Sequence, residues 1–150
     1  MVSQRFPIGT ISGECLNRRQ TRSQRAVGIH CCECAYRVAS ELVEEAWNDA
    51  EKLRHHGATE KISGQLYAAV GSIAANLGEG YSHSSGRDRA RIFEYALGST
   101  RESMVWYQAA QPVLGTDVVR DRLDKLEEIR RLLLATIPRE RGRLIRPSRR

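Results

Sequence analysis

Three arginines crowd the start of a predicted helix, and their type and spacing suit the binding of phosphate groups. Arg87, Arg89 and Arg91 lie in the first turns, where backbone N–H groups have no partner within the helix. Positive charge there opposes the helix dipole at a cost of about 0.3 to 1 kcal/mol per cation. A phosphate would meet both these amides and the guanidinium groups, which offsets that cost. The alternative is a solvated face on which Arg91 forms ordinary ion pairs with Glu94 or Asp88.

A second basic segment ends the sequence. Residues 138–150 hold six arginines against one glutamate, a balance of +5, and residues 1–34 have a balance of +3, which leaves −2 for residues 35–137. Short arginine-rich segments bind nucleic acid through counterion release without a fixed shape. We therefore predict that the tail contacts nucleic acid, and its candidate residues are Arg139, Arg141, Arg143 and Arg146. The alternative is a bias of composition, because the chain has 21 arginines and only 3 lysines.

The cysteines offer half of a metal site. Cys31 and Cys34 form one Cys-x-x-Cys step, whereas a structural zinc site takes four ligands, typically from two such pairs. Cys15 and His30 complete the set only if the adjacent His30 and Cys31 bind one ion together. We expect no metal and no disulfide framework, and we keep a zinc-dependent switch in this segment as an alternative that metal analysis would test.

A catalytic set is not recognisable. Nucleophilic or acid–base catalysis needs a nucleophile, a base within hydrogen-bond reach and a third group that orients the base. The sequence contains no G-x-S-x-G, H-E-x-x-H, Walker or dinucleotide-binding motif. His55 and His56 suit a helix end, where a cation complements the dipole, and His83 suits a loop. We expect no enzymatic activity, no catalytic residues and no cofactor.

Composition and periodicity indicate that these groups are carried by helices. The chain has 150 residues, of which 41% are hydrophobic and only 6% aromatic, which favours one helical domain over a β-sandwich or barrel. Apolar residues recur at intervals of three and four in several segments. These segments predict helices over residues 35–54, 59–78, 86–110 and 116–137. Gly78–Gly80 is expected to break the second helix, Pro112 to stop the third and Pro138 to end the fourth.

Four amphipathic helices with short connections predict an all-α fold, an antiparallel up-down-up-down four-helix bundle over residues 35–137. Residues 1–34 are interpreted as a disordered basic extension or a misplaced start of the gene, and residues 138–150 as an arginine-rich tail. Three consecutive leucines, residues 132–134, widen the apolar face of the last helix and predict self-association. Since neither a signal peptide nor a membrane-spanning stretch is recognisable, we expect a cytoplasmic protein without a membrane partner.

Two segments resemble a known family. The residues QLYAAVGSIAANLGEG (65–80) and YALGSTRE (95–102) are similar to motifs of the four helix bundle proteins related to the 23S ribosomal RNA intervening-sequence protein. The resemblance covers about residues 35–137 and leaves both tails outside. Gly78 departs from the family pattern, which commonly has alanine there. The positions that match the two motifs are Ser72, Ile73, Asn76, Glu79, Gly80, Gly98, Ser99 and Glu102.

The resemblance implies a small helical bundle that assembles as a ring-like homopentamer and has no enzymatic activity. Relatives are encoded within rRNA intervening sequences, or serve as accessory proteins of diversity-generating retroelements that bind nucleic acid and a reverse transcriptase. We therefore expect a non-catalytic oligomeric scaffold that binds RNA or DNA with low sequence specificity. The alternative is an adaptor whose last helix docks a protein partner such as a reverse transcriptase.

The residue types themselves give the motif positions structural roles first. Gly98 and Ser99 are expected to let the third helix approach the second near Gly71. Asn76 and Glu79 are expected to satisfy backbone groups at the corner between these helices, or to pair across a subunit boundary. Glu79 is a further candidate partner for one of the three arginines at the start of the third helix.

Overall fold

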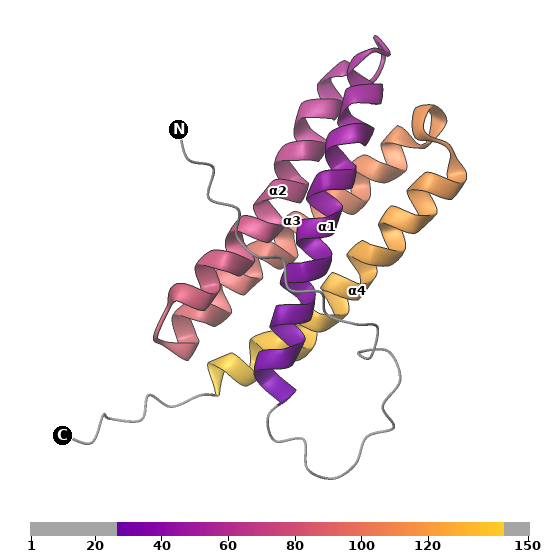
Figure 1. Ribbon diagram of the computed structural model, residues 1–150. Coiled ribbons are helices and arrows are strands. Elements are labelled where there is room, and N and C mark those ends of the chain that lie inside the picture. Colours follow the sequence, from indigo (N-terminus) through magenta and orange to yellow (C-terminus); the bar gives the residue numbers. More distant parts are fainter. Residues whose placement is uncertain (1–26, 143–150) are drawn as a thin grey trace, which may run out of the picture.

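The computed structural model describes residues 27–142, which form four helices packed side by side as a bundle (Figure 1). The helices are α1 (Val27–Arg54), α2 (Glu60–Ser82), α3 (Gly86–Leu114) and α4 (Thr116–Arg141). Each helix packs against the next, and α4 returns to pack against α1, so that α1 and α3 lie across the diagonal. The predicted all-α, four-helix fold is confirmed, and the pentameric ring stays a prediction.

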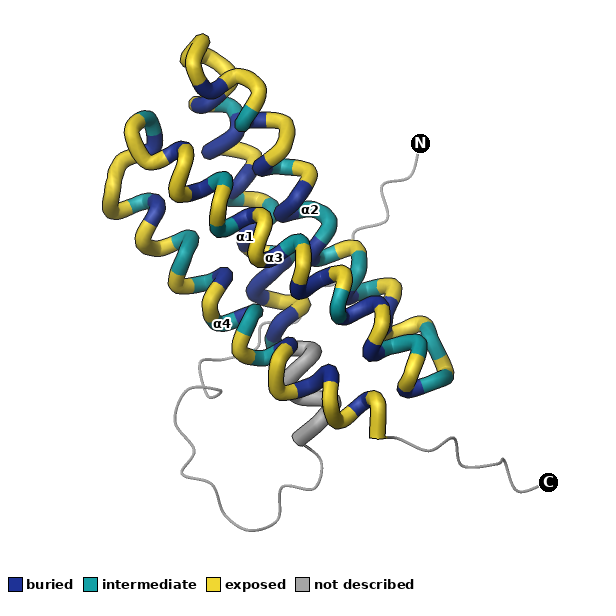
Figure 2. Tube along the Cα trace, turned by 180° about the vertical axis from the view of Figure 1, so that it is seen from behind, coloured by how far each residue is buried: buried dark blue, intermediate teal, exposed yellow. Residues whose placement is uncertain are grey.

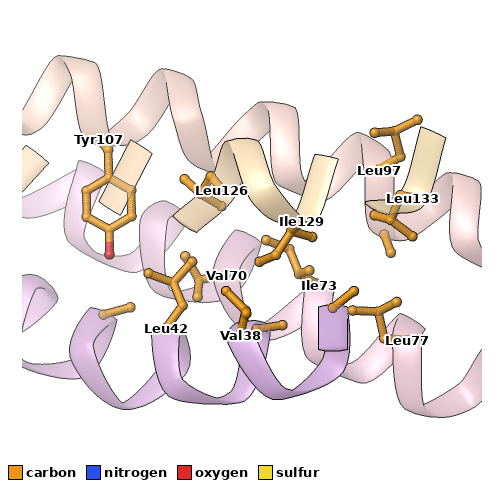
Figure 3. Packing of buried hydrophobic residues seen from close by; sticks show 14 of the residues in the cluster. Val38, Leu42, Val70, Ile73, Leu77, Leu97, Tyr107, Leu126, Ile129 and Leu133 are labelled. Carbon is orange, nitrogen blue, oxygen red and sulfur yellow. The ribbon is translucent and has the colours of Figure 1, made fainter. Parts of the chain in front are cut away.

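One apolar core runs along the bundle and contains the predicted stripes. Figure 3 shows Val38 and Leu42 of α1 facing Leu126 and Ile129 of α4, and all four side chains are buried. Figure 2 shows buried positions facing the centre of the bundle on each helix and exposed positions facing outward. The three leucines of α4 divide between these environments: the first is half-buried, the second is buried, and the third, Leu134, is exposed.

Two helices run past the prolines that were expected to end them. Pro112 lies inside α3 and Pro138 inside α4. Proline removes one backbone hydrogen bond, but each of these prolines is exposed and sits in the last turns of its helix. The residues beyond them are held by the rest of the molecule, because Leu114 is buried in the core and Glu140 is buried against α3. Tertiary contacts therefore outweigh the local cost of proline at both helix ends.

The other expected helix bounds also need correction. α1 begins at Val27 rather than Ala35, and α2 continues through Gly78–Gly80 instead of breaking there. Gly80 is buried, and a Cβ atom built on it would overlap the ring of Phe93 in α3. The glycine that was expected to break α2 therefore allows an aromatic ring of α3 to lie against the backbone of α2.

The connections use local hydrogen bonds and one glycine. The hydroxyl of Ser85 accepts a hydrogen bond from the backbone N–H of Asp88 at 3.5 Å and so caps the start of α3. Gly115 joins α3 to α4 with a φ of 88°, a conformation that favours glycine. Thr59 does not cap α2 with its side chain: its hydroxyl donates to the carbonyl of Leu53 at 2.9 Å and closes the α1–α2 turn.

A polar network joins α1 to α3 and α4 near the start of α4. The carboxylate of Asp49, only 2% exposed, accepts hydrogen bonds from Nε of Arg122 at 2.9 Å and from the hydroxyl of Tyr107 at 3.3 Å. Glu45 accepts a hydrogen bond from Lys125 at 2.5 Å and lies 3.2 Å from Nη1 of Arg122. Because buried charges need partners, this network fixes the register of α4 against α1.

The network predicts a loss of stability in alkaline solution. Burial raises the pKa of Tyr107 above its usual value of 10.0, and the neighbouring charge of Asp49 raises it further. Above about pH 10 the unfolded chain ionises at this residue while the folded chain keeps its proton, so stability falls by up to about 1.4 kcal/mol per pH unit. We expect Tyr107→Phe to flatten this decline, measured as the free energy of unfolding in urea at increasing pH. An equally steep decline in the variant would contradict the assignment.

Candidate nucleic-acid interface

The arginines predicted to bind nucleic acid that the structure describes lie at the end of the bundle where α3 begins and α4 ends (Figure 1). They are Arg87, Arg89, Arg91, Arg139 and Arg141. Two ion pairs join these helix ends across 51 and 47 residues of sequence. Nε of Arg89 donates to the carboxylate of Glu140 at 2.8 Å, and Arg141 pairs with Glu94. The fold therefore brings the arginines of the third predicted helix next to those of the predicted tail.

Arg89 holds this end of the bundle together. Besides its ion pair with Glu140, it donates hydrogen bonds to the backbone carbonyls of His83 at 2.6 Å and Ser84 at 3.1 Å. Its side chain is mostly buried, and that of Glu140 is almost completely buried. Arg89 therefore ties the α2–α3 connection to α4, and its guanidinium group is already occupied in this chain.

Arg87 and Arg91 differ from Arg89 because they lie four residues apart, on one outward face of α3. Both are exposed, and neither forms an ion pair with another residue of the described part of the chain. The same holds for Arg139 near the end of α4. We call Arg87, Arg91, Arg139 and Arg141 the basic end of the bundle.

The ion pairs considered from the sequence form differently in the structure. Glu94 pairs with Arg141 rather than Arg91. Glu79 lies 3.6 Å from His83 rather than beside one of the three arginines. The charged groups of the basic end that have no ion-pair partner among the described residues are therefore all positive. The remaining candidates of the tail, Arg143 and Arg146, lie outside the described residues.

Three motif residues form a small hydrogen-bonded cluster between α2 and α3. Nδ2 of Asn76 donates to the carbonyl of Ser72 at 2.8 Å and lies 3.0 Å from its hydroxyl. The hydroxyl of Ser99 donates to that of Ser72 at 3.1 Å, which joins the two helices. Asn76 thus bonds within its own helix and does not reach the backbone of the α2–α3 corner. The cluster therefore joins α2 to α3 at a partly buried position.

The remaining motif positions divide between core and surface. Ile73 and Gly80 are buried, whereas Glu102 is exposed and accepts a hydrogen bond from Nε1 of Trp106 at 3.2 Å within α3. A Cβ atom at Gly71 or Gly98 would meet nothing within 4 Å. The expectation that these two glycines allow close approach of α2 and α3 is therefore wrong.

Sequence reasoning missed the role of Glu140, which falls within the predicted arginine-rich tail, residues 138–150. The residues Leu133, Ile137 and Glu140 follow at intervals of four and three, so the core stripe of α4 ends on this carboxylate. That spacing was a usable signal, but the partner, Arg89, is far away in the sequence. The pairing of the two became visible only in the fold.

The cysteine segment lies mostly beyond what the structure describes. The side chains of Cys15, His30, Cys31 and Cys32 are outside the described residues, and Cys34 is half-buried. Among the side chains that are described, no three metal-ligating groups come together. The four helices also include none that is long and apolar enough to cross a membrane.

Comparisons with known proteins concern the four-helix region as a whole. The model of a family described as 23S rRNA-intervening sequence protein matches residues 34–135. Among solved structures, a protein of unknown function from the S23 ribosomal protein family of Bacteroides thetaiotaomicron has a similar fold, with a TM-score of 0.67 and 19% sequence identity. The likeness covers 72% of this chain and 98% of that one. No curated protein matches this chain.

Proposed function

Because the chain belongs to the 23S rRNA-intervening sequence protein family, we propose that it is a non-catalytic, self-associating scaffold that binds RNA or DNA through its arginines. The resemblance of residues 65–80 and 95–102 to that family is confirmed by this match. The observation that carries the proposal is the basic end, where Arg87, Arg91 and Arg139 are exposed and have no acidic partner among the described residues.

The position of the tail supports this proposal. α4 ends at the basic end, where the ion pair between Arg141 and Glu94 anchors its last turn to α3. The sequence then continues as RLIRPSRR, which adds four arginines beyond Gly142. The arginines on α3 and the arginine-rich segment that follows α4 therefore adjoin the same end of the bundle. We expect both to contact one polyanion.

Phosphate contacts explain the expected low specificity. Arginines that contact phosphates fix the position of a nucleic acid but do not read its sequence. A single contact is weak, so several copies of the chain acting on one strand raise the affinity through effective concentration. The proposed function therefore needs self-association as well as the basic end.

Removing two arginines of the basic end is expected to weaken nucleic-acid binding. We expect the double substitution Arg87→Ala and Arg91→Ala to raise the Kd about tenfold at moderate salt and to reduce the slope of log K against log salt by about 1 per arginine. Fluorescence anisotropy with a labelled RNA and a duplex DNA of equal length measures both. Neither arginine has a described ion-pair partner, so the fold should be unaffected.

The matched control removes two lysines from the opposite end of the bundle. Lys52→Ala with Lys61→Ala changes the net charge equally, and both lysines are exposed. An equal loss in the control would mean that binding follows net charge rather than the basic end. A wild-type affinity that stays flat between about 50 and 300 mM salt would contradict nucleic-acid binding altogether.

A second candidate is an adaptor that docks a protein partner such as a reverse transcriptase on α4. The exposure of Leu134 favours it, since an exposed leucine on an otherwise packed helix suits a protein contact. A reverse transcriptase gene beside the gene for this chain would favour the adaptor, whereas a position within an rRNA insertion would favour the scaffold.

A further inference from the structure

One exposed aromatic residue follows the arginines of the basic end along α3. Tyr95 is 55% exposed, and it forms no ring contact and no side-chain hydrogen bond with another described residue. Arg87, Arg91 and Tyr95 follow one another at intervals of four residues, and all three are exposed. Residues at this interval are neighbours on the surface of a helix. We call these three residues the Arg–Tyr row.

The next turn of α3 leaves space beside the ring of Tyr95. Gly98, three residues further on, is exposed, and a Cβ atom built on it would meet nothing within 4 Å. Ser99, four residues further on, is half-buried, and its hydroxyl donates to that of Ser72 in α2. The two positions that neighbour Tyr95 on this side therefore place no large side chain over its ring. A flat ligand has room to lie against the ring there.

The charges around the Arg–Tyr row favour an anionic ligand. Neither Arg87 nor Arg91 has an ion-pair partner among the described residues. Glu94, the acidic residue next to Tyr95, is paired with Arg141. Asp88 lies beside the two arginines, but it is half-buried and forms no ion pair with them. The row therefore keeps a net positive charge next to an uncovered aromatic ring.

The ring distinguishes between two kinds of nucleic acid, which the arginines alone do not. Arginines contact phosphates, which single strands and duplexes both present, and the duplex has the greater charge density. The bases of a duplex are stacked inside it, whereas unpaired bases expose a face on which an aromatic side chain can stack. Aromatic rings beside basic side chains are the combination with which proteins bind single strands.

We propose that the Arg–Tyr row binds single-stranded nucleic acid, with a base stacked on Tyr95 and the neighbouring phosphates on Arg91 and Arg87. The proposal rests on the proposed function, nucleic-acid binding at the basic end, and it adds the class of substrate. Every base has an aromatic face, so stacking tolerates any sequence and keeps the low specificity expected from phosphate contacts.

Substitutions at Tyr95 test the stacking contact. The probes are a labelled single-stranded DNA of mixed sequence and the duplex that it forms with its complement, followed by fluorescence anisotropy. We expect Tyr95→Ala to raise the Kd for the single strand about tenfold and the Kd for the duplex less than about twofold. Tyr95→Phe keeps the ring and should bind like the wild type. Tyr95→Leu keeps an apolar side chain without an aromatic face and should lose as much affinity as the alanine variant.

The salt dependence separates stacking from charge. Tyr95→Ala should leave the slope of log K against log salt unchanged, because stacking releases no counterions, whereas Arg87→Ala with Arg91→Ala should reduce it. Val105→Ala is the matched control. It removes another exposed apolar side chain from α3, about 15 Å beyond Tyr95, and should bind both probes like the wild type.

The outcomes distinguish this proposal from the proposed function. A wild type that binds neither probe would overturn nucleic-acid binding itself. A wild type that binds through its arginines, with no loss of single-strand affinity in Tyr95→Ala, would overturn the stacking contact while nucleic-acid binding stands. An equal loss for both probes in that variant would overturn it as well, because a stacked base contributes only to the single strand. Circular dichroism should show every variant folded, since Tyr95 and Val105 are exposed.

Discussion

Replacing Asp49 with alanine is expected to lower the free energy of unfolding by about 3 to 5 kcal/mol. The carboxylate is almost fully buried and accepts hydrogen bonds from Arg122 and Tyr107. Its removal leaves Nε of a mostly buried guanidinium group and a buried hydroxyl without a partner, whereas the contacts with Glu45 and Asp121 that remain serve only Nη1 of Arg122. Urea titration followed by circular dichroism measures the change.

Two controls separate this effect from the loss of any ion pair. Glu41→Ala removes the pair with Arg37 on the same helix, where both side chains are about half exposed, and should cost less than about 1 kcal/mol. Asp49→Leu combined with Arg122→Met replaces both charges by apolar groups and should recover most of the lost stability. If Asp49→Ala were no more harmful than Glu41→Ala, the network would not determine how α4 packs on α1.

The four helices followed from the sequence because each carries an apolar stripe of the right period. Their ends followed only where the signal is local, as with Ser85 before α3 and Gly115 before α4. The helix ends predicted at Pro112 and Pro138 were wrong. The residues beyond each proline stay helical because they contact other helices. Local propensity is outweighed wherever a buried residue follows the apparent stop.

The candidate site was predictable in composition but not in arrangement. The sequence indicates three arginines near the start of α3, yet it does not distinguish the one that turns inward. Arg89 is drawn in by a carboxylate 51 residues away, and no spacing within α3 contains that information. In the same way, the aromatic side chains of α1 fall outside its core stripe, and only the packing of Trp47 on Tyr67 shows which surface they form.

Gly80→Ala is expected to destabilise the protein by about 1 to 3 kcal/mol, although alanine is the better helix former. At an open helical position the change from glycine to alanine stabilises by about 0.5 to 1 kcal/mol. At Gly80 the new Cβ would overlap Cε1 of Phe93 and lie 2.8 Å from its Cδ1. That ring has little room to yield, because it is buried and packs edge to face against Tyr81 with centroids 5.9 Å apart.

Gly64→Ala supplies the opposite sign within the same helix. A Cβ at Gly64 would meet nothing within 4 Å, so this variant should be slightly more stable than the wild type. Shortening the clashing ring with Phe93→Leu should make the alanine at position 80 less harmful than it is alone, because residues in contact do not act additively. Thermal unfolding of the four variants gives the comparison. If Gly80→Ala stabilised the protein as Gly64→Ala is expected to, α2 and α3 would not meet as closely as the ring of Phe93 requires.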